Sequence, residues 1–344
     1  MAKRPTIKQI AEQCDLSLST VSLALRNKPG IPPETRQRVL ETAKALDYRT
    51  KPAHNGNGKH HLTHIGVIVK SQPDDIPQAN PFYSQVLAGI ELACRQHRLN
   101  LLYATMPVNQ DNVPVEMPRL LIEDRMEGLL LVGAFVDETL THVLGRKQVP
   151  VVLVDAYSQT NEYDAVVSEN FQGAYQAVSH LIQNGHRQIG LIASHPYSYP
   201  SLLERRRGYL QALQDHHIAE TYIADCALDK EKAFDAATEL LRQHPKITAL
   251  FGCNDEVAIA AMRAAQSLNR RLPDDLSVIG FDDISLAEHV VPPLTTMKVD
   301  KIGMGQLAVE TLLRRAAGGP ETASTTTAIR PRLIERDSVR KIIE

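Results

Sequence analysis

The sequence lacks the features of a secreted or membrane-embedded protein. Its 344 residues include no tryptophan and only four cysteines, which are scattered without a C-x-x-C pair and suit a reducing compartment. No uninterrupted apolar run approaches the ~20 residues of a membrane span. The basic N-terminus is followed by no apolar segment, so we expect no secretory signal. These absences predict a cytoplasmic protein with no membrane partner.

Motifs of common catalytic sites are also missing. The sequence has no G-x-x-x-x-G-K-[ST] phosphate loop, no G-x-S-x-G elbow and no H-E-x-x-H zinc motif. The adjacent carboxylates Asp282 and Asp283 could in principle do acid–base work, but no other pattern supports catalysis. We therefore expect neither an enzyme nor a cofactor.

The sequence does contain an uneven distribution of charge. Residues 1–64 hold 11 Lys and Arg against 5 Asp and Glu, a formal charge of +6, whereas the whole chain carries −2. The remainder therefore carries −8. A basic head on an acidic body is the distribution expected where one end of a protein meets phosphates.

The basic head has the pattern of three short amphipathic helices between Thr6 and Asp47. A T-x-x-Q capping box, Thr6 to Gln9, opens the first helix. The second opens at Ser17, and the third begins at Pro33. The positions predicted to face inward are Ile7, Ile10, Ala11, Val21, Leu25, Val39, Leu40, Ala43 and Leu46.

This layout predicts a helix-turn-helix. The exposed face of its second helix carries mostly short, hydroxylated side chains that can approach bases and phosphates in a major groove: Leu18, Ser19, Thr20, Ser22 and Leu23. An ordinary three-helix subdomain would have the same layout. The basic charge of the head favours DNA binding.

From Ile65 onward, short apolar runs alternate with helical periods. The expected strands are Ile65–Val69, Leu99–Ala104, Gly128–Val132, Val151–Asp155, Ala165–Ser168, Gln188–Ala193, Thr248–Cys253 and Ser277–Phe281, and one expected helix covers Val115–Arg125. Strands that are continuously apolar indicate parallel sheets covered on both faces. Their number favours two similar α/β subdomains over one sheet.

Ligands of open α/β sheets bind beyond the carboxyl ends of the strands. The candidate residues near those ends are Phe82, Asp155, Arg205, Asn254 and Asp282. Carboxylates, an amide and a guanidinium can bind the vicinal hydroxyls of a sugar, and Phe82 could form an apolar wall. Asp and Asn after a strand are also common helix N-caps, which is the role we expect for Asp255, and a core aromatic at position 82 would look the same.

Residues 49–64 form a polar, glycine-containing stretch that we interpret as a linker. It contains four histidines, His54, His60, His61 and His64. Because no cysteine or carboxylate set accompanies them, a solvated linker is the simpler interpretation, and we expect no metal site.

The segment TIKQIAEQCDLSLSTVSLALRNKPGIPPETRQRVLETAKALDY closely resembles the N-terminal domain of lac repressor-type (LacI/GalR) transcription regulators, without gaps from Thr6 to Tyr48. Further blocks follow in the order of that family: NPFYSQVLAGIE, SENFQGAYQAVSHLIQNGHRQIGLIA, RRRGYLQAL, FGCNDEVAIAAM, LPDDLSVIGFDD and PPLTTMKVD. The resemblance covers essentially the whole chain.

The resemblance implies an all-α helix-turn-helix head plus an α/β core of two doubly wound parallel-sheet lobes, like those of periplasmic binding proteins. The implied boundaries are 1–48 for the DNA-binding domain, 49–64 for the linker and 65–344 for the core. One lobe would take about 65–163 and 293–321, and the other about 164–292 and 322–344.

The resemblance also implies a function. The chain would be a sequence-specific transcription regulator, a repressor, that binds double-stranded operator DNA as a homodimer. A small-molecule effector, a sugar or sugar derivative, would bind between the lobes and control operator affinity. A solute-binding protein without regulation is the alternative class, which the basic head opposes.

Residue roles follow from the matching positions. Leu18 and Ser19 would select bases, and Ser17 would lie with them on the recognition helix. Phosphate contacts are implied for Thr6, Thr20, Ser22, Thr35 and Tyr48. Ligand contacts are implied for Asp155, Arg205, Asn254 and Asp282.

The chain departs from the family at three positions that concern DNA. Leu23 stands where an arginine is usual, which predicts an operator without a guanine preference at that position. Arg26 replaces a usual asparagine and is expected to hold a phosphate. In the linker, Asn57 between Gly56 and Gly58 replaces the family's wedge leucine, so we expect no ordered hinge helix.

Overall fold

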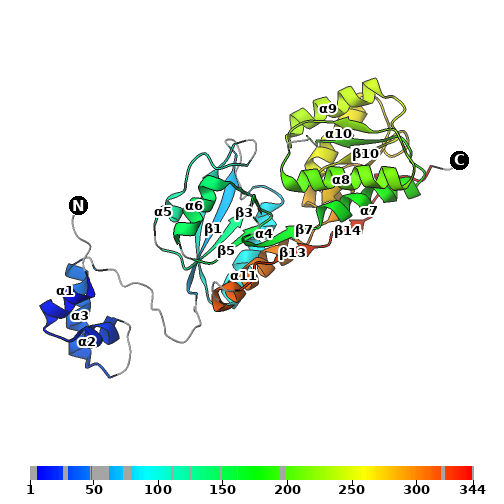
Figure 1. Ribbon diagram of the computed structural model, residues 1–344. Helices are drawn as coiled ribbons and strands as arrows, with labels where there is room; N and C mark the ends of the chain where they lie inside the picture. Colours follow the sequence, from blue (N-terminus) through cyan, green and yellow to red (C-terminus); the bar gives the residue numbers. More distant parts are fainter. Residues whose placement is uncertain are drawn as a thin grey trace. The chain divides into compact units, whose positions relative to one another are not determined.

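A computed structural model of the chain describes residues 6–25, 30–46, 48, 62–72, 79–109, 112–123, 125–147, 149–160, 162–193, 195, 198–318 and 322–342. The chain forms two compact units, one within residues 1–60 and one within residues 61–344 (Figure 1). Arg26 and the linker up to residue 61, with Asn57, lie outside the described residues. None of the described helices is long and apolar enough to span a lipid bilayer.

The N-terminal unit consists of three helices, α1 (Ile7–Cys14), α2 (Leu18–Leu25) and α3 (Pro33–Ala45). The predicted capping box is present, since the Gln9 amide donates to Thr6 Oγ1 at 3.4 Å and the Thr6 amide donates to Gln9 Oε1 at 2.7 Å. Asp15 ends α1 in the left-handed conformation (φ 51°). Ser17 Oγ then accepts from the Thr20 amide at 3.1 Å and opens α2. The helix-turn-helix layout is confirmed.

The three helices enclose a small core of buried side chains: Ile10, Ala11, Cys14, Val21, Ala24, Val39 and Ala43. Leu25 and Leu46 pack at its edge. The prediction that Leu40 faces this core is wrong, because its side chain is 48% exposed. Leu40 follows the buried Val39 by one position, and a helix turns by about 100° per residue.

The first lobe of the core unit is a parallel six-stranded sheet of order β13-β7-β5-β3-β1-β2. Its strands are β1 (His64–Ser71), β2 (Asn100–Pro107), β3 (Gly128–Val132), β5 (Val151–Val154), β7 (Asp164–Ser168) and β13 (Thr326–Ile329). Its helices are α4 (Tyr83–Gln96), α5 (Arg119–Ile122), α6 (Glu138–Lys147) and α11 (Lys301–Gly318), and a short strand pair adds β4 (Phe135–Val136) and β6 (Tyr157–Ser158).

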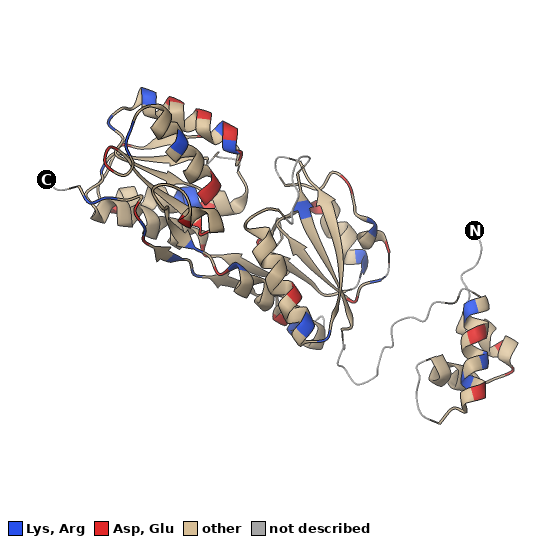
Figure 2. Cartoon of the chain, turned by 180° about the vertical axis from the view of Figure 1, so that it is seen from behind, with Lys and Arg blue, Asp and Glu red and all other residues tan. Residues whose placement is uncertain are grey.

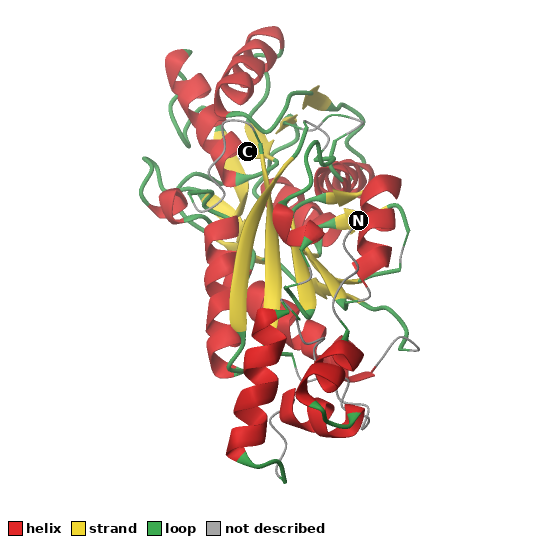
Figure 3. Cartoon of the chain, turned by 90° about the vertical axis from the view of Figure 1, so that its left-hand side faces the viewer, coloured by secondary structure: helices red, strands yellow, loops and turns green. Residues whose placement is uncertain are grey.

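The alternation of side chains along the strands assigns these helices to two faces. Ile65 and Val67 of β1 share a buried cluster with side chains of α4 and α11, which pack on each other. Ile68 belongs to a second cluster with Leu121 of α5 and Leu140 of α6. Figure 3 shows helices on both sides of the long strands. The prediction of parallel sheets covered on both faces is confirmed.

The second lobe is a six-stranded sheet of order β14-β12-β11-β10-β8-β9, parallel except where β14 pairs with β12. Its strands are β8 (Ile189–Ile192), β9 (Tyr222–Ala224), β10 (Ala249–Gly252), β11 (Ser277–Asp282), β12 (Thr295–Lys298) and β14 (Arg332–Ile334). Its helices are α7 (Asn170–Gln183), α8 (Pro200–Asp215), α9 (Lys230–Gln243), α10 (Asp255–Ser267) and the 3₁₀ turn η1 (Ser285–Glu288).

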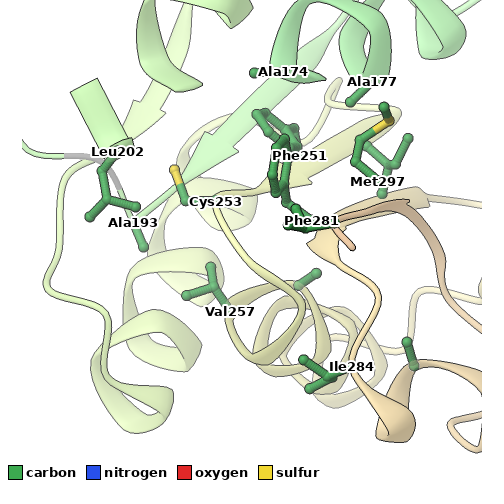
Figure 4. Packing of buried hydrophobic residues seen from close by; sticks show 14 of the residues in the cluster. Ala174, Ala177, Ala193, Leu202, Phe251, Cys253, Val257, Phe281, Ile284 and Met297 are labelled. Carbon is green, nitrogen blue, oxygen red and sulfur yellow. The ribbon is translucent and has the colours of Figure 1, made fainter. Parts of the chain in front are cut away.

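Two phenylalanine rings lie in the hydrophobic core of this lobe. Phe251 of β10 and Phe281 of β11 are fully buried, and Figure 4 shows them near Met297 of β12 and close to Ala174 and Ala177 of α7. Small residues on α7 let the helix approach the sheet closely. This packing fixes the end of β11, which carries Asp282.

The chain crosses between the two sheets three times, and the predicted lobe boundaries are wrong by several residues. Residues 164–168 and 326–329 pair within the first sheet, whereas residues 295–298 pair within the second. Each crossing follows the end of a strand, because a strand that has paired must finish before the chain can leave its sheet. The crossings therefore follow β7, β12 and β13.

The core also begins earlier than predicted. Leu62 is buried and β1 starts at His64, although residues 62–64 were predicted to belong to the linker. The carboxylate of Glu127 accepts from the Thr63 amide at 2.5 Å, the Thr63 hydroxyl at 2.8 Å and the His64 amide at 3.1 Å. These bonds anchor the point where the chain enters the core.

The helix predicted over Val115–Arg125 is wrong in extent, because α5 covers only Arg119–Ile122. Pro118 interrupts the segment and is extended (φ −65°, ψ 146°) immediately before the helix. Proline has no amide hydrogen for a helical bond, so a helix begins after it more readily than it passes through it.

Candidate effector and DNA sites

The outer face of α2 is uncharged and accessible. Leu18 is 50% exposed and Leu23 42% exposed, and α2 is tan throughout in Figure 2 because it carries no charged residue. Ser17 Oγ lies 2.7 Å from Ser19 Oγ and 2.8 Å from Thr20 Oγ1. The hydroxyls at the start of α2 therefore form one hydrogen-bonded group.

The other predicted DNA-contact residues lie at the start of α1, within α2 and α3, and beyond α3. Thr6 is exposed at the N-cap of α1, and Ser22 and Thr35 are half-buried. Tyr48 packs at the edge of the head core, and its amide donates to the Ala43 carbonyl at 2.8 Å. Arg26, the remaining predicted contact, lies outside the described residues.

In the core, the chain turns sharply where the parallel strands end. The residues just past β3, β5 and β8 and the last residue of β11 all have positive φ: Gly133 (74°), Asp155 (46°), Ala193 (64°) and Asp282 (107°). Three of them are not glycine, and such conformations cluster at ligand sites, where the surrounding structure holds them in place. They bring Asp155 and Asp282 to the carboxyl edges of the two sheets.

Arg205 of α8 is the centre of a buried polar cluster in the second lobe. Its Nε donates to Asn170 Oδ1 at 2.9 Å, its Nη1 to the Cys253 carbonyl at 2.5 Å and its Nη2 to Asp282 Oδ1 at 3.2 Å. The guanidinium carbon lies 3.8 Å from the ring centroid of Phe281. These contacts orient the guanidinium plane. Burial raises the pKa of Asp282, and the charge of Arg205 opposes that rise.

Asp155 supplies a carboxylate from the first lobe. It is 8% exposed and accepts a hydrogen bond from the Tyr83 hydroxyl at 3.2 Å. Burial raises the pKa of Asp155 to about 6, while the charges of Lys70 and Arg205 act in the opposite direction. Because Arg205 belongs to the second lobe, the cluster draws on side chains of both lobes.

Asn254, and not Asp255, caps the helix that follows β10. Asn254 is the N-cap of α10, with its Oδ1 accepting from the Val257 amide at 2.9 Å. Asp255 is fully buried and accepts from the Ile284 amide at 2.8 Å and from Thr296 Oγ1 at 2.5 Å. The prediction that Asp255 is the cap is therefore wrong. Burial, followed by the nearby charge of Asp282, raises the pKa of Asp255 to about 8.

Phe82 lies at the start of α4, where Asn80 Oδ1 accepts from the amides of Phe82 and Tyr83, both at 3.0 Å. The Phe82 ring meets the Tyr83 ring edge-on, with centroids 5.4 Å apart, and packs against the large core cluster. Of the two neighbouring rings, Tyr83 is the one that contacts Asp155.

We compared the chain with known protein families and with proteins of similar sequence. Residues 6–51 match the model of bacterial regulatory proteins of the lacI family, and residues 178–339 match a periplasmic binding protein-like domain. The HTH-type transcriptional repressor PurR of Edwardsiella ictaluri is 30% identical over 338 residues, which cover 97% of this chain and 96% of that protein. The chain belongs to the LacI family.

Other LacI-family proteins agree with this assignment. The ribose operon repressor of Haemophilus influenzae is 30% identical over 339 residues, covering 97% of this chain and 98% of that protein. The solved complex of the transcriptional regulator CelR with cellobiose has a TM-score of 0.69 at 26% identity and covers 97% of this chain and 100% of that one. The protein is thus a DNA-binding transcriptional repressor with an effector-binding core, and not an enzyme.

Within this LacI-family core, the sequence predictions missed several members of the cluster. Lys70, Tyr83, Asn170 and Tyr199 all lie near Asp155 or Arg205. Lys70 and Asn170 could have been found by the rule that selected Asp155, since each stands at or just beyond the carboxyl end of an apolar strand. The loop before α8 gives no comparable signal for Tyr199.

The histidines of the linker raised the possibility of a metal site. Within the part of the chain that the structure describes, no three His, Cys, Asp or Glu side chains gather to hold a metal ion. His64 lies instead at the start of β1, with Nδ1 2.9 Å from Thr63 Oγ1. His54, His60 and His61 lie outside the described residues.

Proposed function

We propose that this repressor binds a pseudo-palindromic operator as a homodimer in the cytoplasm, and that a sugar or sugar derivative bound between the two lobes of its core controls operator affinity. The proposed ligand contacts are Phe82, Asp155, Arg205, Asn254 and Asp282. The effector would shift the population of two arrangements of the lobes.

The observation that carries this proposal is the buried cluster of Arg205, Asp282 and Asp155. Arg205 and Asp282 come from one lobe and Asp155 from the other, and all three are less than 9% exposed. Oriented carboxylates and a guanidinium can form paired hydrogen bonds with vicinal hydroxyls. The ribose operon repressor and the CelR–cellobiose complex among the similar proteins favour a carbohydrate.

The proposed DNA contacts rest on the exposed face of α2 and the basic head. Base selection is assigned to Leu18, Ser19 and Leu23, and the other proposed contacts are Thr6, Ser17, Thr20, Ser22, Arg26, Thr35 and Tyr48. One small head buries too little surface for tight specific binding, and a dimer reads two half-sites.

The test begins with selection of bound sites from random DNA. Footprinting on the selected site is then repeated with a panel of sugars, which includes ribose and cellobiose. A sugar that strengthens or weakens protection identifies the effector class and its direction. Absence of protection under every condition would overturn the proposed DNA binding.

A matched pair of variants tests the site. Arg205→Lys loses the planar fork that makes paired bonds, so the sugar should no longer change the footprint at the concentration that affects the parent protein. Arg207→Lys on the same helix, where the Arg207 side chain is 71% exposed, should respond like the parent. Equal responses from both variants would count against the assigned site.

A further inference from the structure

Tyr199 joins the two lobes through its hydroxyl group. The residue immediately precedes α8 of the second lobe. Its hydroxyl is shared between two main-chain carbonyl oxygens of the first lobe, that of Ala134 at 3.1 Å and that of Asp155 at 3.2 Å. These acceptors follow β3 and β5, whose ends turn through Gly133 and Asp155 with positive φ. A single side chain therefore contacts two strand ends of the opposite lobe.

The ring of Tyr199 adds two further contacts with the first lobe. Its centroid lies 5.2 Å from that of Tyr157, with the ring planes at 86°, which is the favourable edge-to-face arrangement. The ammonium group of Lys70 lies over the Tyr199 ring, 4.8 Å from its centroid, in a cation–π contact. Every one of these partners belongs to the first lobe.

The contacts of Tyr199 suit a reversible closure. If the lobes separated, water could replace the hydrogen bonds of the Tyr199 hydroxyl. Their net contribution to the free energy of closure is therefore only that of an ordinary hydrogen bond that exchanges with water. The lobes are also joined covalently by the three crossings, and hydrogen bonds run from Asn170 Nδ2 to the Tyr157 hydroxyl at 3.2 Å and from Lys301 Nζ to the Asp282 carbonyl. A contact of this size can set the ratio of closed to open molecules without preventing opening.

We propose that Tyr199 is a latch that favours the closed arrangement of the lobes before any effector binds. The latch is a property of the core itself. Its effect on effector affinity rests on the proposed function, because an effector that needs both lobes binds best to molecules that are already closed.

The test compares Tyr199→Phe with Tyr209→Phe in the full chain. Tyr199→Phe removes the two hydrogen bonds that the Tyr199 hydroxyl makes to the first lobe and keeps the ring. Tyr209 is fully buried, and its hydroxyl donates to the Ile189 carbonyl at 2.8 Å within the second lobe. Tyr209→Phe therefore removes a bond of the same kind without touching the closure.

The readout is the distance between spin labels on non-natural amino acids at Glu138 of α6 and Gln214 of α8, both exposed and on different lobes. Without effector, Tyr199→Phe should raise the ratio of open to closed molecules roughly fivefold, the equivalent of one net hydrogen bond. Tyr209→Phe should match the parent protein. A Tyr199→Phe distribution identical to that of the parent would overturn the latch.

The effector arm separates the two proposals. The ligand is ribose or cellobiose, whichever alters the footprint. Tyr199→Phe should weaken the binding of that sugar to the protein by a factor no larger than the factor by which it raises the open-to-closed ratio. A shift in lobe distance in a protein that responds to no sugar would retain the latch and overturn the sugar effector. Weaker sugar binding without a shift in distance would assign Tyr199 to direct ligand contact and reject the latch.

Discussion

Arg205 and Asp282 form a buried ion pair, with Nη2 3.2 Å from Oδ1, that reaches from α8 to the end of β11. Asp282 holds its side of the pair from a left-handed backbone (φ 107°). The pair fixes the direction of two groups that a polyhydroxyl ligand would need.

Asp282→Asn keeps the shape of the side chain and removes its charge. Hydrogen bonds to charged groups contribute about 1.5–3 kcal/mol, so calorimetry should show sugar affinity reduced by one to two orders of magnitude. Asp274→Asn, at a side chain that is 58% exposed and paired with Arg271, is the control and should bind like the parent. Unchanged affinity in Asp282→Asn would remove this residue from the site.

Asp255 should make stability fall as pH rises. Its pKa of about 8 in the folded protein lies above the ordinary value of 3.8. The folded state therefore retains a proton that the unfolded state loses, and the free energy of unfolding declines between about pH 4 and pH 8. In urea titrations at several pH values, Asp255→Asn should lack this part of the decline. Parallel curves for the parent and the variant would contradict the prediction.

Glu127 should have the opposite pH dependence. Burial alone would raise the pKa of its carboxyl, but the hydrogen bonds from Thr63 and His64 outweigh burial and lower it. The stabilisation is present above the ordinary pKa of 4.5 and is lost as pH falls through the lower, folded value. Glu127→Gln should cost about 1 kcal/mol at neutral pH and speed hydrogen exchange at the Thr63 amide.

A surface glutamate provides the comparison for that variant. Glu123 pairs with Arg125 at 3.0 Å where both side chains are at least 40% exposed. Glu123→Gln should change the free energy of unfolding by no more than about 0.5 kcal/mol. Equal losses in the two variants would show that Glu127 acts as an ordinary surface charge.

Leu23→Arg should give the protein a guanine preference that we expect the parent to lack. An arginine can bond a guanine through two hydrogen bonds, worth about 1–3 kcal/mol of discrimination. Site selection from random DNA should yield a guanine at one additional position with the variant. Leu40→Arg, at an exposed position of α3, adds the same charge as a control and should leave the selected sequence unchanged. A guanine preference at that position in the parent would overturn the prediction.

Gly305 is required where α11 crosses α4. A Cβ placed there would lie 2.1 Å from the Val86 carbonyl oxygen, far inside contact distance. Gly305→Ala should therefore destabilise the core by about 1–3 kcal/mol through overpacking. A Cβ at Gly145 of α6 would meet no atom within 4 Å. Gly145→Ala should instead stabilise by about 0.5–1 kcal/mol, since alanine favours the helix. Urea unfolding measures both.

The sequence predicted those elements whose signals are local. The Thr6 capping box, the apolar runs of β1, β3 and β5, and the polar strand ends at Asp155 and Asp282 could be recognised without partners. The capping box involves residues only three positions apart, and the apolar runs follow from burial of the strands on both faces of the sheet. These were enough to predict the head, the two lobes and the centre of the candidate site.

The remaining features depend on distant partners. β13 and β14 are half-exposed segments of a threonine- and arginine-rich stretch, and only their pairing with β7 and β12 makes them strands. Val39 and Leu40 are consecutive apolar residues of α3, so the sequence pattern alone did not show that only Val39 faces the core. Tyr199 shows its role only when the opposite lobe supplies the carbonyl oxygens of Ala134 and Asp155.

The three crossings between the sheets also bear on synthesis by the ribosome. The last strand of the first sheet, β13, pairs with β7, and β14 then pairs with β12 in the second sheet. A nascent chain that has emerged only as far as α11 therefore presents two unfinished sheets with open edges, which are sites of aggregation. A nonsense mutation just before Thr326 would therefore leave both lobes incomplete. In two domains encoded one after the other, a mutation at the same distance from the end would truncate only the second domain.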